Sequence, residues 1–190
     1  MAGVETLGAR HLYIPVSHQG TLMVQISRAT LANLSAEVAT PTYDPTTATT
    51  GIVHFGVGAF HRAHEAMYVD RLLAAGHTDW AICGVGLMPF DLGVRDALGA
   101  QDNLYTLVTK DPSGVSEARD VGSIVQYLYA PDAPDAVLQT LVSPTTRIVS
   151  LTITEGGYSV NDATGHFDPQ DEATLADISA FGAEVPRSVL

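Results

Sequence analysis

Positive charge is scarce in this 190-residue chain, where nine Lys and Arg face 21 Asp and Glu and give a net charge of −12. Because nucleic acids and anionic membrane surfaces bind clustered positive charge, the composition argues against both as partners. Cys83 is the only cysteine, which excludes an internal disulfide and a cysteine-based zinc site. No apolar run approaches the roughly 18 residues that predict a membrane span. The N-terminus has no positively charged start leading into an apolar stretch, so we expect a cytoplasmic protein.

Hydrophobic residues make up 46% of the chain and charged residues 16%, which suits one domain with a buried core and an appendage. We expect residues 1–50 to form an N-terminal leader or edge segment. Residues 1–26 show no clear hydrophobic period, and residues 40–50 read as a turn-rich surface connection. Periodic apolar segments fill residues 51–190, which are predicted to form the main domain.

The chain is organised around residues 51–64. An apolar run of strand composition over 52–55 leads into Gly56 and Gly58, and a helix is expected over about 60–75. A strand that turns on glycines into a helix exposes backbone N–H groups and the positive helix end at one point, which attracts phosphate. We therefore expect bare amides at Gly56 and Gly58 to hold the diphosphate of a dinucleotide.

The glycine pattern is incomplete, because His61 stands where G-x-G-x-x-G has its third glycine. That glycine lets the helix pack closely on its strand, so we expect this helix to sit further out or at another angle. A lone G-x-G also occurs in plain tight turns, and the spacing alone favours neither interpretation. The surrounding strands and helix favour the phosphate site. Arg62 is then expected near the pyrophosphate, the alternative being an ordinary solvated arginine.

Strands and helices alternate along the rest of the chain. Residues 80–87 form a continuous apolar run, typical of a parallel strand covered on both faces. Further strands are expected at 103–109, within 115–125 and at 147–154, with helices near 91–99 and 135–142. Alternation with right-handed crossovers gives a parallel sheet. The predicted fold class is α/β, a Rossmann-type parallel sheet with helices on both faces.

Two acidic residues lie where a dinucleotide and its substrate would need them. Asp91 follows the second strand, where a carboxylate accepts hydrogen bonds from the adenosine ribose and repels the 2′-phosphate of NADP, so it selects NAD. Glu155 lies just past strand 147–154, where it would position a substrate hydroxyl or pass a proton as an auxiliary catalytic residue. The alternative for Asp91 is a plain helix-terminal charge, and for Glu155 a capping role.

The residue patterns that several other kinds of catalytic site require are absent from the sequence. His61 and His64 share a helix face, but Tyr68 stands four positions after His64, so the metalloprotease pattern is absent and no metal is expected. No tyrosine is followed by lysine four residues later, and neither G-x-x-x-x-G-K-[ST] nor G-x-S-x-G occurs. The only lysine, Lys110, has no obvious partner as a base for an alcohol proton.

Three blocks, residues 51–64, 80–87 and 148–158, are together far more specific than G-x-G alone. They resemble the polyol-specific long-chain dehydrogenases, the mannitol dehydrogenases among them, and the match runs from about residue 27 to residue 190. The resemblance implies an N-terminal Rossmann-type domain and a mostly helical C-terminal domain. It also implies metal-free use of NAD or NADP to interconvert a polyol and its ketose, typically D-mannitol and D-fructose.

Position by position, the resemblance implies a phosphate loop made of Gly56, Val57, Gly58, Ala59, Phe60, His61 and Arg62. It places Asp91 at the adenosine ribose, in favour of NAD, and Glu155 near the substrate. The family's catalytic lysine lies in the C-terminal domain, which this sequence does not match. Residues 186–190 read as a helix cut short, so we expect a fragment that is inactive in isolation.

The first hypothesis is the cofactor half of an NAD-dependent oxidoreductase of polyol and carbohydrate metabolism, acting on D-mannitol and D-fructose and monomeric at full length. Fructuronate reductase and D-arabinitol dehydrogenase remain alternatives within the family, because substrate contacts come mainly from the other domain. The second hypothesis is a non-catalytic nucleotide-binding module that is complete at this length.

Overall fold

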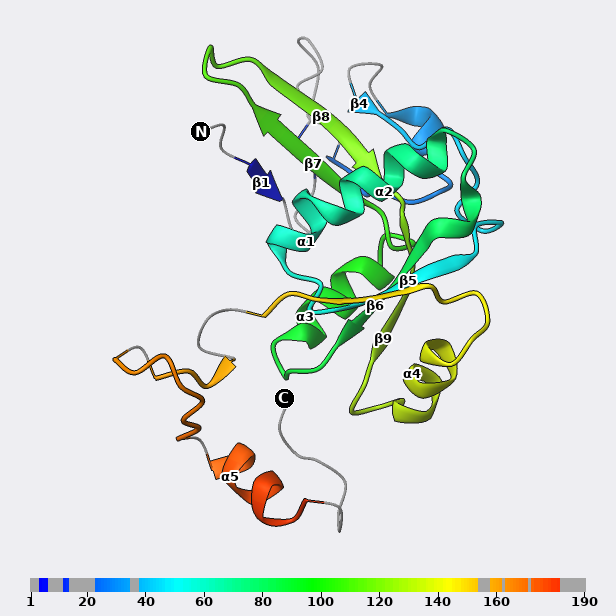
Figure 1. Cartoon of the computed structure of the whole chain (residues 1–190). Coiled ribbons are helices and arrows are strands. Elements are labelled where there is room, and N and C mark those ends of the chain that lie inside the picture. The colour runs from blue at the N-terminus through cyan, green and yellow to red at the C-terminus, as the bar shows by residue number, and fades with distance from the viewer. Residues whose placement is uncertain are drawn as a thin grey trace. The chain divides into compact units, whose positions relative to one another are not determined.

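The computed structural model describes residues 4–6, 12–13, 23–34, 38–153, 158–161, 163–170 and 172–181. The chain divides into two compact units, residues 1–152 and residues 153–190 (Figure 1). The first unit holds β1 (Val4–Thr6), β2 (Leu12–Tyr13), β3 (Met23–Val24), η1 (Leu31–Asn33), β4 (Val38–Ala39), β5 (Thr50–Phe55), α1 (Ala59–Ala63), α2 (Glu65–Ala74), η2 (Thr78–Trp80), β6 (Ala81–Gly86), α3 (Asp91–Gly99), β7 (Tyr105–Lys110), β8 (Ser116–Val121), β9 (Ile124–Tyr129), α4 (Pro134–Leu141) and β10 (Ile148–Leu151). The second unit holds α5 (Glu172–Ser179).

The main sheet has the strand order β10-β5-β6-β9, and all its pairs are parallel. The chain moves outward from β5 through β6 to β9 and then returns to place β10 on the other side of β5. This reversal is the topological switch point of a doubly wound sheet, beside which ligands bind at the carboxyl ends of the strands. The predicted Rossmann-type parallel sheet is confirmed.

A second sheet, with the order β1-β7-β8-β4, differs from the sequence-based expectation. The strands expected at 103–109 and 115–125 exist as β7 and β8, but they pair antiparallel with each other. The reason is their short connection, in which Asp111 Oδ1 accepts hydrogen bonds from the backbone N–H groups of Ser113 and Val115. A turn of this length joins antiparallel neighbours, whereas a parallel pair needs a longer crossover.

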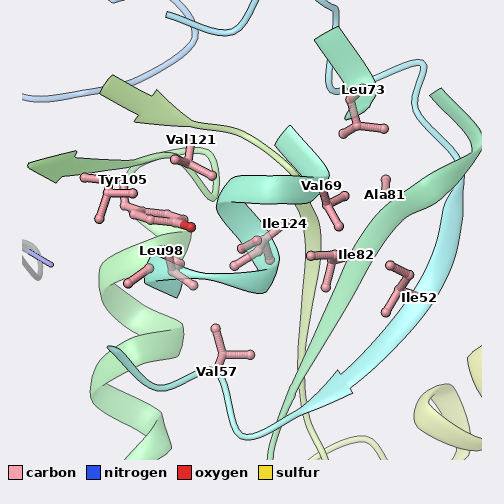
Figure 2. Close-up of a cluster of buried hydrophobic side chains, with 13 residues drawn as sticks. Ile52, Val57, Val69, Leu73, Ala81, Ile82, Leu98, Tyr105, Val121 and Ile124 are labelled. Atoms are coloured by element: carbon pink, nitrogen blue, oxygen red, sulfur yellow. The ribbon is translucent and has the colours of Figure 1, made fainter. Parts of the chain in front are cut away.

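Helices cover both faces of the parallel sheet (Figure 1). On one face, α1, α2 and α3 share a core with β5, β6 and the second sheet (Figure 2). On the other face, Val137 of α4 packs against Val53, Cys83 and Val85. Alternate residues of β5 therefore serve opposite faces, with Ile52 in the first core and Val53 in the second. The first core consists of Ile52, Val57, Ala63, Ala66, Val69, Leu73, Ala81, Ile82, Leu98, Tyr105, Leu107, Val121 and Ile124.

The helix expected over 60–75 is broken in two at His64, whose φ of −119° and ψ of −85° are not helical. The carbonyl of Phe60 accepts from the backbone N–H of His64 at 3.1 Å. It also lies 2.8 Å from Nδ1 of the same residue. A side chain that competes for a helical carbonyl is a recognised cause of a kink. Glu65 consequently begins a new helix, and its carboxylate lies 3.3 Å from Nδ1 of His54 on β5.

Asp70 of α2 connects the helix to the turn between β8 and β9 and to the segment before β5. Its Oδ1 accepts from the Gly122 N–H at 3.0 Å and from the Tyr43 hydroxyl at 2.6 Å. Burial raises the pKa of this carboxyl group above its ordinary value. Among the helices that the structure describes, none is both long enough and apolar enough to cross a bilayer.

Candidate dinucleotide site

The site begins at the end of β5, where Gly56 turns the chain away from the sheet. Gly56 has a φ of +86°, a left-handed conformation that side chains disfavour. Its N–H donates to the Val85 carbonyl of β6 at 3.0 Å, and its own carbonyl accepts from Gly58 N–H at 2.7 Å. The turn is thus closed on itself and anchored to the neighbouring strand, beside the switch point between β5 and β10.

The expectation that Gly56 and Gly58 themselves present bare amides is wrong, because both N–H groups have the acceptors just named. Within residues 56–61, the amides of Val57, Ala59, Phe60 and His61 have no acceptor among the described residues. The last three form the first turn of α1, whose N–H groups have no intrahelical partner. The glycines shape the turn, and their neighbours supply the donors.

Neither the backbone angles nor the packing of the described residues requires glycine at position 58. Its φ of −78° and ψ of −176° are extended backbone that any residue adopts. Among the described residues, a Cβ added there would meet only the Gly56 carbonyl, at 3.9 Å. The backbone at Gly58 is therefore open on this side, directly before the first turn of α1. This is the geometry of a loop that leaves room for an anion against its backbone.

Side chains of the predicted phosphate loop point in different directions. Val57 and His61 are each 1% exposed and lie in the interior, so only their backbone groups are available to a ligand. Ala59 and Phe60 are exposed. Arg62 reaches back to the turn, where its guanidinium donates to the Val57 carbonyl at 2.7 Å. Burial lowers the pKa of Arg62 from its ordinary value.

His61 fills the space where a third glycine would allow close helix packing. Its ring stacks on that of His54 from β5, with centroids 3.6 Å apart and planes 13° apart. Neither ring nitrogen of His61 has a hydrogen-bond partner in the part of the chain described. Burial, followed by the charge on His54, lowers the pKa of His61 to about 3, so the ring is neutral. The helix is held off the strand by the thickness of this ring pair.

Ligand atoms of His54, His61 and Glu65 lie within 4.8 Å of one another, which raises the question of a metal. The lone pairs of imidazole nitrogens lie in the ring planes, and the two planes here are nearly parallel. Lone pairs in stacked rings run side by side and do not converge on one ion, so this set does not have the form of a metal site. His64, the other histidine considered from sequence, instead stacks on Phe60.

Asp91 lies one strand away from the glycine turn, as the first residue of α3. Its Oδ2 accepts from the backbone N–H groups of Leu87 and Met88, both at 2.9 Å, directly after β6 ends. The other carboxylate oxygen, Oδ1, has no hydrogen bond to any described residue. An Ala side chain at Gly86 would come within 2.8 Å of Asp91 Cβ, so Asp91 packs directly over the strand end. One oxygen builds the turn and one remains for a ligand.

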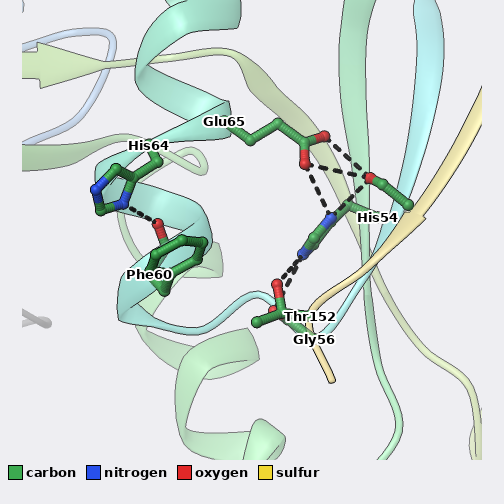
Figure 3. Close-up of polar contacts among 7 residues, drawn as sticks. His54, Gly56, Phe60, His64, Glu65 and Thr152 are labelled. Atoms are coloured by element: carbon green, nitrogen blue, oxygen red, sulfur yellow. Dashed lines mark hydrogen bonds and ion pairs between the residues drawn. The ribbon is translucent and has the colours of Figure 1, made fainter. Parts of the chain in front are cut away.

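Glu155, predicted near the substrate, lies outside the described residues, as do its neighbours Gly156 and Gly157. The last described position before them is Ile153. The sequence also missed a polar group beneath the turn, formed by His54, Glu65, Ser150 and Thr152 (Figure 3). One signal was available, namely a histidine that interrupts an otherwise apolar strand.

Comparison with known proteins gives consistent results. The family model for the mannitol dehydrogenase Rossmann domain matches residues 50–187. A polyol:NADP oxidoreductase of Gluconobacter oxydans is 51% identical over 166 residues, which are 86% of this chain and 34% of that protein. A mannitol 2-dehydrogenase of Aspergillus clavatus is 50% identical over 153 residues, which are 80% of this chain and 30% of that protein.

Among solved structures, the chain is similar to the Pseudomonas fluorescens mannitol 2-dehydrogenase in its ternary complex with NAD and D-mannitol. The TM-score is 0.76 and the identity 43%, over 82% of this chain and 32% of that one. The chain therefore spans about a third of the length of these relatives.

Proposed function

The chain belongs to the mannitol dehydrogenase family, whose Rossmann domain model matches residues 50–187, and from this premise we propose that it binds NAD as the cofactor part of a polyol dehydrogenase. The observation that carries this proposal is the open backbone at Gly58, next to the first turn of α1, where a Cβ would meet no atom of the described residues closer than 3.9 Å. A diphosphate fits such a place because backbone donors and the helix end both favour negative charge.

Asp91 supports NAD over NADP. Its free Oδ1 lies at the end of β6, the strand next to the glycine turn, where the adenosine ribose of a dinucleotide binds in this class of sheet. A carboxylate accepts from both ribose hydroxyls and repels a 2′-phosphate. One relative is a polyol:NADP oxidoreductase and another binds NAD, so the family resemblance alone does not choose between the two cofactors.

The proposed reaction is hydride transfer between D-mannitol and D-fructose, with Glu155 as an auxiliary residue near the substrate. The mannitol 2-dehydrogenases among the relatives support this substrate pair. Fructuronate or D-arabinitol are alternative substrates within the family. Because the chain spans about a third of its relatives, we expect it to bind the cofactor without oxidising D-mannitol. Cytoplasmic location and a monomeric state at full length stay predictions from the sequence.

The test is a titration of the chain with NADH and with NADPH, followed by energy transfer from Trp80, the only tryptophan, to the nicotinamide. The unchanged chain should prefer NADH. Asp91→Asn keeps an oxygen for the Leu87 and Met88 amides and loses only the charge and the second acceptor. Its dissociation constant for NADH should rise about tenfold, the equivalent of a charge-assisted hydrogen bond, while that for NADPH stays level or falls.

Asp135→Asn is the matched control, because Asp135 is an exposed acid in the first turn of α4, on the other face of the sheet. It should leave both dissociation constants unchanged. A chain that is folded by circular dichroism and binds neither nucleotide would refute the proposed function. Equal losses of NADH binding in the Asp91 and Asp135 variants would refute the role of Asp91.

A further inference from the structure

His54 lies beneath the glycine turn with both ring nitrogens in contact with oxygen atoms (Figure 3). The side chain is 2% exposed and projects from β5 toward α1 and α2. Its Nδ1 is 2.8 Å from Ser150 Oγ and 3.3 Å from Glu65 Oε2. Its Nε2 is 3.0 Å from Thr152 Oγ1 and 3.2 Å from the Gly56 carbonyl oxygen. The ring therefore connects α2, β10 and the turn.

The proton on Nδ1 follows from its partners. The Ser150 hydroxyl donates to Glu65, whose two carboxylate oxygens lie 3.0 and 3.3 Å from Oγ. With its hydrogen committed to the carboxylate, Ser150 offers His54 only a lone pair. The hydrogen bond from His54 is also the main cause that lowers the pKa of Glu65, which is therefore ionised. Nδ1 faces two acceptors and must carry a hydrogen.

The proton on Nε2 follows in the same way. The Gly56 carbonyl can only accept, and without a hydrogen on Nε2 two lone pairs would face each other across 3.2 Å. The Thr152 hydroxyl can donate or accept, so it fits either state of the ring. A hydrogen on Nε2 satisfies both the carbonyl and the hydroxyl oxygen. With hydrogens on both nitrogens, His54 is an imidazolium paired with the Glu65 carboxylate.

Few other charged or titratable groups of the described residues face this pair. From α1, the stacked His61 ring is neutral, and Arg62 keeps its positive charge while it donates to the Val57 carbonyl. From α2 comes Glu65, and from β10 come Ser150 and Thr152. On β6, the residue paired with His54 is Gly84, which has no side chain. One carboxylate balances one imidazolium.

We propose that His54 is a positioning residue for the dinucleotide: as an imidazolium oriented by Glu65, it donates from Nε2 to the Gly56 carbonyl and so holds the phosphate-binding turn in its left-handed conformation. The same nitrogen contacts Thr152 at the end of β10, so the ring joins the two strands that flank the switch point. This inference rests on the proposed dinucleotide site. It predicts weaker NADH binding when the donor to the Gly56 carbonyl is removed.

Two substitutions distinguish the contribution of Nε2 from that of Nδ1. In His54→Gln the amide nitrogen reaches the place of Nε2 and donates to Gly56. In His54→Asn the shorter amide reaches only the place of Nδ1. His54→Gln should bind NADH within about threefold of the unchanged chain, and His54→Asn should bind about tenfold more weakly, as expected for the loss of one hydrogen bond.

His77→Gln is the control, since His77 is an exposed histidine at the opposite end of β6, and it should keep the NADH affinity of the unchanged chain. Equal affinities of His54→Gln and His54→Asn would overturn the inference and leave the proposed function standing. Failure of the unchanged chain to bind NADH would overturn the proposed function itself.

A second readout needs neither nucleotide nor a variant. Nitrogen-15 spectra of the imidazole side chains in the nucleotide-free chain distinguish a doubly protonated ring from either neutral tautomer. We expect His54 to show hydrogens on both nitrogens, because both face hydrogen-bond acceptors. A neutral His54 in the unchanged chain would contradict the inference directly.

Discussion

Asp70 shows at the scale of one residue how α2 is connected to the turn between β8 and β9. Its carboxylate is 1% exposed and receives the Gly122 N–H and the Tyr43 hydroxyl on the same oxygen, Oδ1. The other oxygen, Oδ2, is 3.9 Å from Arg119. Hydrogen bonding thus depends on one acceptor atom, while the negative charge is poorly compensated in a buried place.

Asp70→Asn should therefore be tolerated far better than Asp70→Ala. Asparagine keeps an acceptor at the place of Oδ1, so the free energy of unfolding should change by less than about 1 kcal/mol. Alanine leaves the Gly122 and Tyr43 donors buried without a partner, and should cost about 3 kcal/mol. Denaturant unfolding near neutral pH measures both. Equal losses in the two variants would show that the charge, not the acceptor, matters.

The raised pKa of Asp70 determines how the stability of Asp70→Asn, relative to that of the unchanged chain, changes with pH. A carboxyl group whose folded pKa is raised destabilises the fold only when ionised, so the penalty is absent below the unfolded pKa of about 3.9. The stability of Asp70→Asn relative to the unchanged chain should rise with pH from that point, and level off above the folded pKa. Unfolding curves at several pH values measure this difference, and a difference that falls with pH would contradict it.

At this scale the sequence predicted residue types better than their partners. The sequence places Asp91 after an apolar strand, and it does lie at that strand's end. The two amides that bind its Oδ2 come from a turn that the sequence pattern does not predict. The free donors were expected on the glycines and belong to their neighbours, because hydrogen bonds within a tight turn depend on backbone angles. His54 was missed because its partners on β10 are 96 and 98 residues away in sequence.

At the scale of elements, the fit between β6 and α3 determines where Asp91 lies. A Cβ at Gly86 would come within 2.8 Å of Asp91 Cβ and 2.5 Å of the Tyr127 hydroxyl oxygen. Gly86→Ala should push α3 outward, lower the free energy of unfolding by about 1 to 3 kcal/mol and weaken NADH binding. Titration and denaturant unfolding of one sample measure both effects.

Gly93→Ala is the control within the same helix, because a Cβ there meets nothing within 4 Å. Alanine in the interior of a helix should stabilise the chain by about 0.5 to 1 kcal/mol and leave NADH binding unchanged. Normal nucleotide affinity in Gly86→Ala would mean that the position of Asp91 is not set by this contact.

The positions of elements with strong apolar patterns could be predicted from the sequence. The strands with which they pair were harder to predict. Residues 81–86 are buried throughout, as the continuous apolar run indicated. The hairpin of β7 and β8 was expected within the parallel sheet, because its strands alternate like any others and only the turn at Asp111 reveals an antiparallel pair. The break at His64 depends on one side-chain contact that periodicity does not contain.

At the scale of the whole molecule, both apolar cores lie within the first compact unit, residues 1–152. A chain that ends at Thr152 should therefore stay folded. Cys83, the only cysteine, is a convenient probe, because burial raises the pKa of its thiol to about 12 and leaves it inaccessible. Its reaction with an aromatic disulfide reagent should be slow in both chains, with rates within about threefold of each other.

Guanidinium-unfolded samples of the two chains provide the control, since both should react at the rate of a free thiol. A shortened chain whose Cys83 reacts about a hundredfold faster than in the full chain would show that residues 153–190 are needed for the fold of residues 1–152.

Gly58 has one consequence for how this molecule can change over evolutionary time. Because any residue can adopt the backbone angles of Gly58, and a Cβ there would meet no described atom closer than 3.9 Å, glycine only enlarges the number of conformations open to the unfolded chain. Mutation would tend to replace it with something that makes the protein sturdier. Its retention would then reflect selection for binding the dinucleotide. Replacement of this glycine in a descendant protein would indicate that this binding role has been lost.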